Sequence, residues 1–291
     1  MKRKIALILI MLLFVALPGC RQTQGDIEIA ATTLPVYEFT TTLCEGTNIN
    51  VTRLITEEVS CLHDYTLQAK QMKSVENADR IVISGAGLED FLDDILTDKA
   101  KLIDASGNID IHCSESTHHD HDTHSHEQDS HIWLAPENAK TMAANICKQL
   151  SAAYPQHTDI FNTNLSRLNE KFDKLIAYAN NELANISCRE IITFHDGFSY
   201  MAEAFDLTIL HTIEEESGSE ASAAELIEMI SIVSEHKIPA IFTEKNSSGA
   251  AASIIAAETD VRTYALDMAM SGDSYFTAMY NNIDTLKEAL Q

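Results

Sequence analysis

Short apolar runs alternate with amphipathic segments along most of the chain. Runs rich in Val, Ile and other apolar residues predict strands over 27–34, 50–55, 80–84, 101–103, 190–194, 207–213, 238–243 and 261–266. Segments with helical spacing predict helices over 36–43, 67–78, 88–96, 197–204, 223–236, 249–258 and 275–290. Strands that alternate with helices at this spacing are typical of parallel βαβ units, so we predict an α/β fold.

The middle of the chain breaks this alternation with two helices and no strand between them. Pro136 suits the first turn of a helix that runs to about Ala153, and a second helix is predicted over 158–183. Its apolar positions form one continuous stripe, made of Phe161, Leu165, Leu168, Phe172, Leu175 and Ala179. At 1.5 Å per residue this helix is roughly 40 Å long, which favours a connector between domains. A coiled-coil segment is the alternative, although the stripe is short for one.

We therefore predict two lobes, each with a mainly parallel sheet flanked by helices, joined by one long rigid helix. The N-terminal lobe covers 26–135 and the C-terminal lobe covers 187–291, with the helices of 136–186 between them. The length of 291 residues is sufficient for two domains of ordinary size.

One stretch, 110–129, has a composition that cannot build a core. It combines acidic residues with six histidines within 15 positions, namely His112, His118, His119, His121, His124 and His126. We interpret it as a surface loop of low complexity. Neutral imidazoles chelate zinc well, so the loop is predicted to collect metal as an auxiliary site, the alternative being a polar linker that happens to be rich in histidine.

Four further residues that can bind a metal lie at or just beyond the ends of predicted elements. His195 follows a buried strand, His63 follows the strand 50–55, Asp267 follows the strand 261–266, and His131 precedes the helix that contains Pro136. Ligands of α/β sheets bind at the carboxyl ends of strands, so three imidazoles and one carboxylate could meet there as a four-ligand metal site. We treat His157, His211 and His236 as structural or surface residues.

The N-terminus predicts export. Lys2-Arg3-Lys4 is a basic segment, and residues 5–17 form an apolar run of 13 residues that is short for a membrane span. The run ends in Leu17-Pro18-Gly19-Cys20, which resembles a bacterial lipobox. We predict a signal peptide over 1–19, lipidation of Cys20 and a tether over 20–25. An ordinary secretory signal or an uncleaved anchor is the alternative.

The remaining composition adds two constraints. The formal net charge of -24 disfavours nucleic acid as a partner, because phosphate binding needs a cationic surface. Cys44 and Cys61 flank one predicted strand and could form a disulfide in an exported protein, which spacing alone cannot decide. Cys113 borders the histidine-rich stretch and could assist metal capture.

Several motifs together resemble a known family. Ser60-Cys61-Leu62-His63-Asp64-Tyr65, Ser130-His131-Ile132-Trp133-Leu134, Phe194-His195-Asp196 and Ile241-Phe242-Thr243-Glu244 look like the successive motifs of the zinc and manganese substrate-binding proteins of bacterial ABC importers. The similarity covers nearly the whole mature chain, including the histidine-rich loop before His131. In two places the chain departs from the family pattern. Leu62 stands where a proline usually precedes the histidine, and Lys245 stands where a proline often follows the glutamate.

The resemblance implies two α/β lobes with a rigid linking helix, and metal ligands at His63, His131, His195 and Asp267. Glu244 is then either a hydrogen-bond acceptor behind the ligands, which we favour, or a competing ligand. Relatives that handle manganese resemble a site with glutamate at the position of His195. Three histidines and one aspartate therefore favour Zn(II) as the transported ligand, with Mn(II) as the alternative.

The predicted function is metal capture for import, and not catalysis. The partners implied are an ABC permease and its ATPase, with the membrane reached through the N-terminal lipid of an extracytoplasmic monomer. A zinc-dependent hydrolase is a distant alternative, because His63, His131 and His195 with Glu244 could imitate three ligands and a general base. No H-E-x-x-H motif is present. Cell adhesion is a third class, which some relatives have been proposed to serve and which the sequence does not test.

Overall fold

Two four-stranded parallel sheets organise the computed structural model, which describes residues 26–59, 62, 65–93, 95–96, 98–112, 128–212, 221–247 and 249–291. The first sheet has the order β2-β1-β3-β4, with β1 (Ile27–Ala31), β2 (Ile49–Arg53), β3 (Arg80–Ile83) and β4 (Leu102–Asp104). The second has the order β6-β5-β7-β8, with β5 (Glu190–Thr193), β6 (Thr208–Thr212), β7 (Ala240–Glu244) and β8 (Arg262–Leu266). The predicted α/β class with mainly parallel sheets is confirmed.

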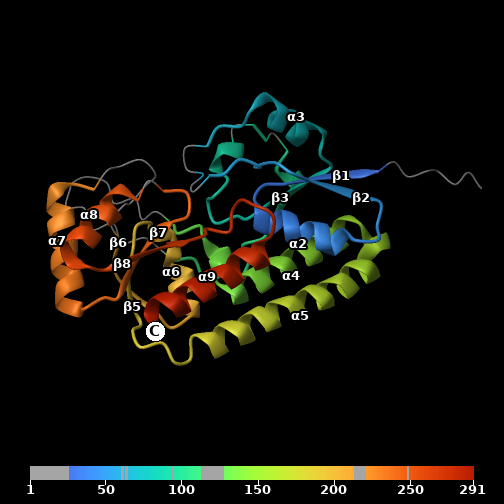
Figure 1. The fold of residues 1–291 in the computed structure, drawn as a ribbon. Helices are drawn as coiled ribbons and strands as arrows, with labels where there is room; N and C mark the ends of the chain where they lie inside the picture. Colours follow the sequence, from blue (N-terminus) through green and yellow to red (C-terminus); the bar gives the residue numbers. More distant parts are fainter. Residues whose placement is uncertain are drawn as a thin grey trace, which may run out of the picture.

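Helices surround both sheets (Figure 1). Their bounds are α2 (Leu34–Cys44), α3 (Ala69–Asn77), α4 (Pro136–Ala153), α5 (Thr158–Glu182), α6 (Ser199–Ala204), α7 (Ala223–His236), α8 (Ala250–Thr259) and α9 (Tyr275–Leu290). Pro136 stands in the first turn of α4, where its missing N–H group would have had no helical partner. Within the described residues, no helix is both long and apolar enough to cross a membrane.

The predicted helix over 88–96 is wrong. The described residues there form turns and one short 3-10 helix, Asp90–Leu92. Gly85, Ala86 and Gly87 all have positive φ, so the chain turns sharply before the segment. The side chain of Glu89 then folds back and accepts hydrogen bonds from the backbone N–H groups of Ser84 and Gly85, which holds the turn in place of a helical first turn.

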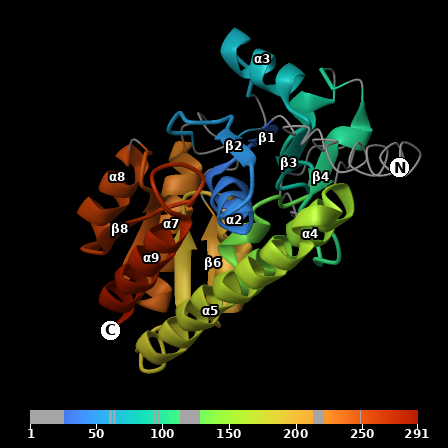
Figure 2. The same ribbon diagram turned by 90° about the vertical axis from the view of Figure 1, so that its right-hand side faces the viewer.

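The long helix α5 is confirmed and packs against α2, α4 and α9. It runs beside α4 along one side of the molecule (Figure 2). Its 25 residues span about 38 Å. The predicted stripe is buried except for Leu165, which is half-buried. A polar residue joins it: buried Asn164 donates to the carbonyl oxygens of Leu43 and Glu45 at the C-terminal end of α2.

One large hydrophobic cluster includes side chains from both sheets and from α2, α4, α5 and α9. A second, smaller cluster lies under α7 and α8. Strand β5 divides its side chains between the two, because neighbouring residues on a strand point to opposite faces. Ile191 belongs to the large cluster and Ile192 to the smaller one. The second sheet therefore shares one face with the rest of the protein and covers its other face with its own helices.

Candidate metal centre

The structure describes three of the four predicted ligands. His195 lies two residues after the end of β5, Asp267 directly follows β8, and His131 precedes a 3-10 turn, Ile132–Leu134, that leads into α4. Each of the three lies at or just beyond the end of the element that the sequence predicted for it. His63 lies outside the described residues.

His195 and Glu244 meet where the strand order of the second sheet reverses. The chain moves from β5 to β6 on one side and then to β7 on the other, so the carboxyl ends of β5 and β7 border the crevice between them. His195 lies just after β5, and Glu244 is the last residue of β7. The Nδ1 atom of His195 lies 3.1 Å from Oε1 of Glu244, and both side chains are about nine-tenths buried or more.

His131 has an equivalent carboxylate partner. Its Nδ1 atom lies 2.9 Å from Oδ1 of Asp129, which also accepts the backbone N–H of His131. The hydroxyl of Ser199 donates to Oδ2 of Asp129, and the hydroxyl of Tyr200 donates to its carbonyl oxygen. Burial alone would raise the pKa of Asp129, but its hydrogen bonds with His131 and Ser199 lower it below its ordinary value. Asp129 is therefore held as a carboxylate.

The two imidazoles face each other through their other nitrogens. Because a carboxylate accepts at each Nδ1, that atom carries the proton and each Nε2 presents a lone pair. The Nε2 atoms of His131 and His195 are 3.4 Å apart. Two nitrogens bound to one tetrahedral zinc, at Zn–N bonds of about 2.0–2.1 Å, would be separated by about 3.3–3.4 Å. The pair is thus spaced as two ligands of a single zinc ion.

Close packing fixes this pair. His131 is only 3% exposed. A Cβ atom built on Gly197 would lie 2.7 Å from the Nδ1 atom of His131, so the backbone of Gly197 packs directly on the imidazole. On the other side, the indole N–H of Trp133 donates to the carbonyl oxygen of Met268 at 2.8 Å. That bond ties the His131 turn to the segment that contains Asp267.

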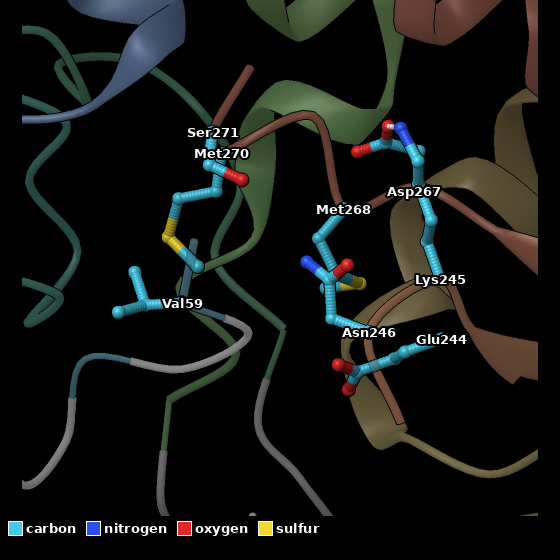
Figure 3. A pocket seen from close by; sticks show the side chains of 8 residues that line it. All are labelled: Val59, Glu244, Lys245, Asn246, Asp267, Met268, Met270 and Ser271. Carbon is cyan, nitrogen blue, oxygen red and sulfur yellow. Dashed lines mark hydrogen bonds and ion pairs between the residues drawn. The ribbon is translucent and has the colours of Figure 1, made fainter. Parts of the chain in front are cut away.

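Both carboxylate oxygens of Asp267 are in contact with other groups of the protein. Its Oδ2 atom lies 3.0 Å from Nζ of Lys245, and its Oδ1 accepts the backbone N–H of Ala269 at 2.8 Å. Figure 3 shows the charged ends of Lys245 and Asp267 meeting at one side of a small pocket, with Glu244 pointing elsewhere. In the part of the chain that the structure describes, no three His, Cys, Asp or Glu side chains are grouped so that they could hold a metal ion. The structure thus brings two predicted ligands together and leaves Asp267 paired with a lysine.

The first sheet has a corresponding crevice, between β1 and β3, and buried polar side chains fill it. The Thr32 hydroxyl donates to Oε1 of Glu89, and the hydroxyls of Thr33 and Ser84 lie 3.1 Å apart. Burial raises the pKa of Glu89 to about 7, while its hydrogen bonds from Thr32, Ser84 and Gly85 oppose a larger rise.

Of the six histidines in the histidine-rich stretch, only His112 lies within the described residues. Its ring stacks on Tyr200 with centroids 4.1 Å apart, and its Nε2 lies 3.1 Å from a carboxylate oxygen of Glu203. Its carbonyl oxygen accepts the backbone N–H of Asp129. The two ends of the stretch are therefore joined beside α6. His118, His119, His121, His124 and His126 lie outside the described residues, as do Cys20, Cys61 and Cys113, while Cys44 is a buried free thiol.

Sequence reasoning missed three residues of this site. Asp129 was included in the polar loop, although it stands two positions before a predicted ligand, which is a usable signal for a carboxylate partner. Gly197 and Ser199 carry no recognisable signal in a single sequence, because their roles depend on how the chain after β5 packs against His131.

The structure has two parallel sheets, a long helix and two adjacent histidines, each with a carboxylate at Nδ1. These features define a binding protein of the two-lobed metal-binding class. The chain belongs to the family described as "Zinc-uptake complex component A periplasmic", whose model matches residues 29–289. This confirms the resemblance inferred from the motifs.

Relatives and solved structures agree with this family. The chain is 32% identical to the "Zinc-binding lipoprotein AdcA" of Streptococcus pneumoniae over 98% of its own length and 61% of the relative's. The chain thus spans about three fifths of that relative. The crystal structure of the Zn(II)-bound ZnuA-like domain of the S. pneumoniae AdcA matches with a TM-score of 0.74 and 29% identity, covering 91% of this chain and 99% of the domain. The laminin-binding protein of Streptococcus agalactiae matches with a TM-score of 0.80 at 22% identity, covering 91% of this chain and 100% of that one, which shows the fold alone.

Proposed function

We propose that this protein is the extracytoplasmic component of a bacterial ABC importer, which captures Zn(II) and delivers it to a membrane permease and its ATPase. The observation that carries the proposal is the 3.4 Å separation of the His131 and His195 Nε2 atoms, each on an imidazole supported by a carboxylate. This spacing suits one tetrahedral zinc ion. Membership of a family of uptake-complex components supports a binding role over catalysis.

We assign the complete ligand set to His63, His131, His195 and Asp267, with Asp129 and Glu244 as hydrogen-bond acceptors that orient the two described histidines. The ligands come from an N-terminal lobe over 26–135 and a C-terminal lobe over 187–291. The large hydrophobic cluster shared by both sheets supports only modest lobe movement on metal binding. Acid should release the metal, because imidazoles must lose their protons to bind it.

The histidine-rich stretch serves in this proposal to raise the local zinc concentration, and Cys20 carries the lipid that holds a monomer at the cell membrane. The zinc hydrolase alternative needs Glu244 as a general base beside metal-bound water. Its carboxylate instead lies against Nδ1 of His195, on the side of the ring opposite Nε2, so the geometry favours an orienting role.

The decisive experiment measures metal bound to purified mature protein that has been stripped with chelator and reloaded in competing zinc and manganese. Three proteins are compared: the wild type, a His195→Ala variant, and a variant without residues 113–127 that retains His112 and its contacts with α6. His157→Ala serves as a matched control, because the His157 ring contacts Asn48, just before β2, and Phe161 of α5, and neither belongs to the proposed site.

One zinc per chain that survives deletion of 113–127 and is lost in His195→Ala would support the interlobe site. A deletion variant that holds no tight metal would instead identify the histidine-rich stretch as the binder and overturn the ligand assignment. Preference for manganese over zinc would retain the importer and change its cargo.

A further inference from the structure

Lys245 and Asp267 are brought together by strand register. Glu244 of β7 pairs with Leu266 of β8, so the next residue of each strand lies beside the other. The backbone N–H of Lys245 donates to the carbonyl oxygen of Leu266 at 2.9 Å, which fixes this arrangement beyond the last paired residues. The ammonium of Lys245 then reaches Oδ2 of Asp267 at 3.0 Å. The register thus places a cation directly on a proposed metal ligand.

A metal ion and this ammonium oppose each other at the carboxylate of Asp267. A zinc bound to Asp267 would lie about 2.0–2.2 Å from a carboxylate oxygen, and its positive charge would repel the ammonium next to it. The Oδ1 atom accepts the N–H of Ala269 and keeps a second lone pair, but a metal bound there would still lie on the same carboxylate as the ammonium. A metal that binds Asp267 must therefore either displace Lys245 or bind against its positive charge.

We propose that Lys245 is a specificity-determining residue: it competes with the metal for Asp267, and so disfavours metals that depend on an oxygen ligand. This inference rests on the proposed zinc-binding function. Zinc retains the imidazoles of His131 and His195 whether or not Asp267 is released. Manganese, which prefers oxygen ligands, depends more on the carboxylate, so its affinity is lowered more strongly.

The test replaces Lys245 with methionine, which keeps the length of the side chain and removes its charge. Lys245 is 65% exposed, so the fold should tolerate the change. Lys287→Met is the matched control, because Lys287 forms a similar ion pair with Glu182 between α9 and the end of α5. Dissociation constants for zinc and for manganese are measured for both variants, the wild type and His195→Ala by competition with a chromophoric chelator.

Exposed ion pairs of this kind correspond to roughly a twofold to fivefold change in an equilibrium constant. We expect Lys245→Met to bind both metals more tightly, with a gain of about twofold to fivefold for manganese and a smaller gain for zinc, and Lys287→Met to match the wild type. Unchanged affinity in Lys245→Met, or a gain for zinc that equals or exceeds the gain for manganese, would overturn the inference. His195→Ala distinguishes a failure of this inference from a failure of the proposed function, since normal zinc binding by that variant would refute the proposed site itself.

A second measurement follows the lysine directly. The Lys245 amine should react faster with an acylating reagent after zinc loading, as read by mass spectrometry of the labelled peptides, because the metal removes its partner at Asp267. Lys287 provides the internal reference. Equal labelling of Lys245 with and without bound zinc would contradict displacement.

Discussion

Replacing Gly197 with alanine would place a methyl group against the imidazole of His131. The new Cβ would lie 2.7 Å from Nδ1 and 2.8 Å from Cε1 and Cγ, whereas ordinary contacts begin at 3.4 Å. The ring or the backbone must therefore move by about 0.7 Å. His131 has little room to yield, because it is buried and held by Asp129 on the same nitrogen.

Metal ligands must be held to within roughly 0.5 Å of their working geometry. A 0.7 Å shift at His131 should weaken zinc binding about tenfold to a hundredfold, which is the range found when groups that orient a ligand are lost. Overpacking should also lower the free energy of unfolding of the metal-free protein by about 1–3 kcal/mol. Gly197 does not have a positive φ, so backbone strain does not contribute.

Zinc affinity of Gly197→Ala would be measured by chelator competition, and stability by urea unfolding of the metal-free protein. Gly107→Ala is the control, since a Cβ there would lie 3.6 Å from its nearest neighbour, an ordinary contact, and Gly107 has no positive φ either. Wild-type zinc affinity in Gly197→Ala would refute the claim that this close contact positions His131.

Three further outcomes are expected. Asp129→Asn keeps an oxygen for Nδ1 of His131 but removes the negative charge, so zinc affinity measured by titration calorimetry should fall about tenfold; an unchanged affinity would exclude the charge as a contributor. The raised pKa of Glu89, about 7 against an ordinary 4.5, means that the folded protein retains a proton which the unfolded chain loses. The stabilisation from this group is full below about pH 4.5 and falls by about 3 kcal/mol as the pH rises to 7. Glu89→Gln should therefore make the free energy of urea unfolding less dependent on pH over that range. Parallel pH profiles of the two proteins would contradict this prediction. Asn164→Leu leaves the carbonyl oxygens of Leu43 and Glu45 without their donor, which should lower the free energy of unfolding by about 1–3 kcal/mol. Zinc affinity should stay unchanged, and a loss of zinc binding would show that the connector helix acts on the site.

The sequence predicted the order of strands and helices well where apolar periodicity was strong. The long helix α5 and the bounds of α4, α7 and α9 follow from continuous stripes and from clear breakers such as Pro155. The helix over 88–96 failed because its apolar spacing looked helical, while Glu89 bonds to the turn before it. A side chain that folds back onto the backbone leaves no trace in periodicity. The burial of Asn164 in α5 could not be predicted for the same reason, because its side chain bonds to distant backbone carbonyls.

The site divides in a similar way. That His131 and His195 lie at element ends could be predicted, because strand ends are visible in the sequence and parallel strands end on the same edge. Glu244 was predicted as a hydrogen-bond acceptor behind the ligands, but the sequence did not assign it to a particular histidine. The role of Asp129 was missed, since it depends on the fold of the loop before His131. The pairing of Lys245 with Asp267 depends on the register of β7 and β8, which the sequence does not define.

The smaller hydrophobic cluster under α7 and α8 divides the C-terminal part of the protein into two layers of different cooperativity. Its members, such as Met229 and Ile255, do not belong to the large cluster that includes side chains of α5 and α9. Local openings of α7 and α8 can therefore occur without loss of the shared core, and their amide hydrogens should exchange with solvent sooner than those of α5. Substitutions in this outer layer would be absorbed locally, which leaves α7 and α8 freer to change over evolution than the helices of the shared core.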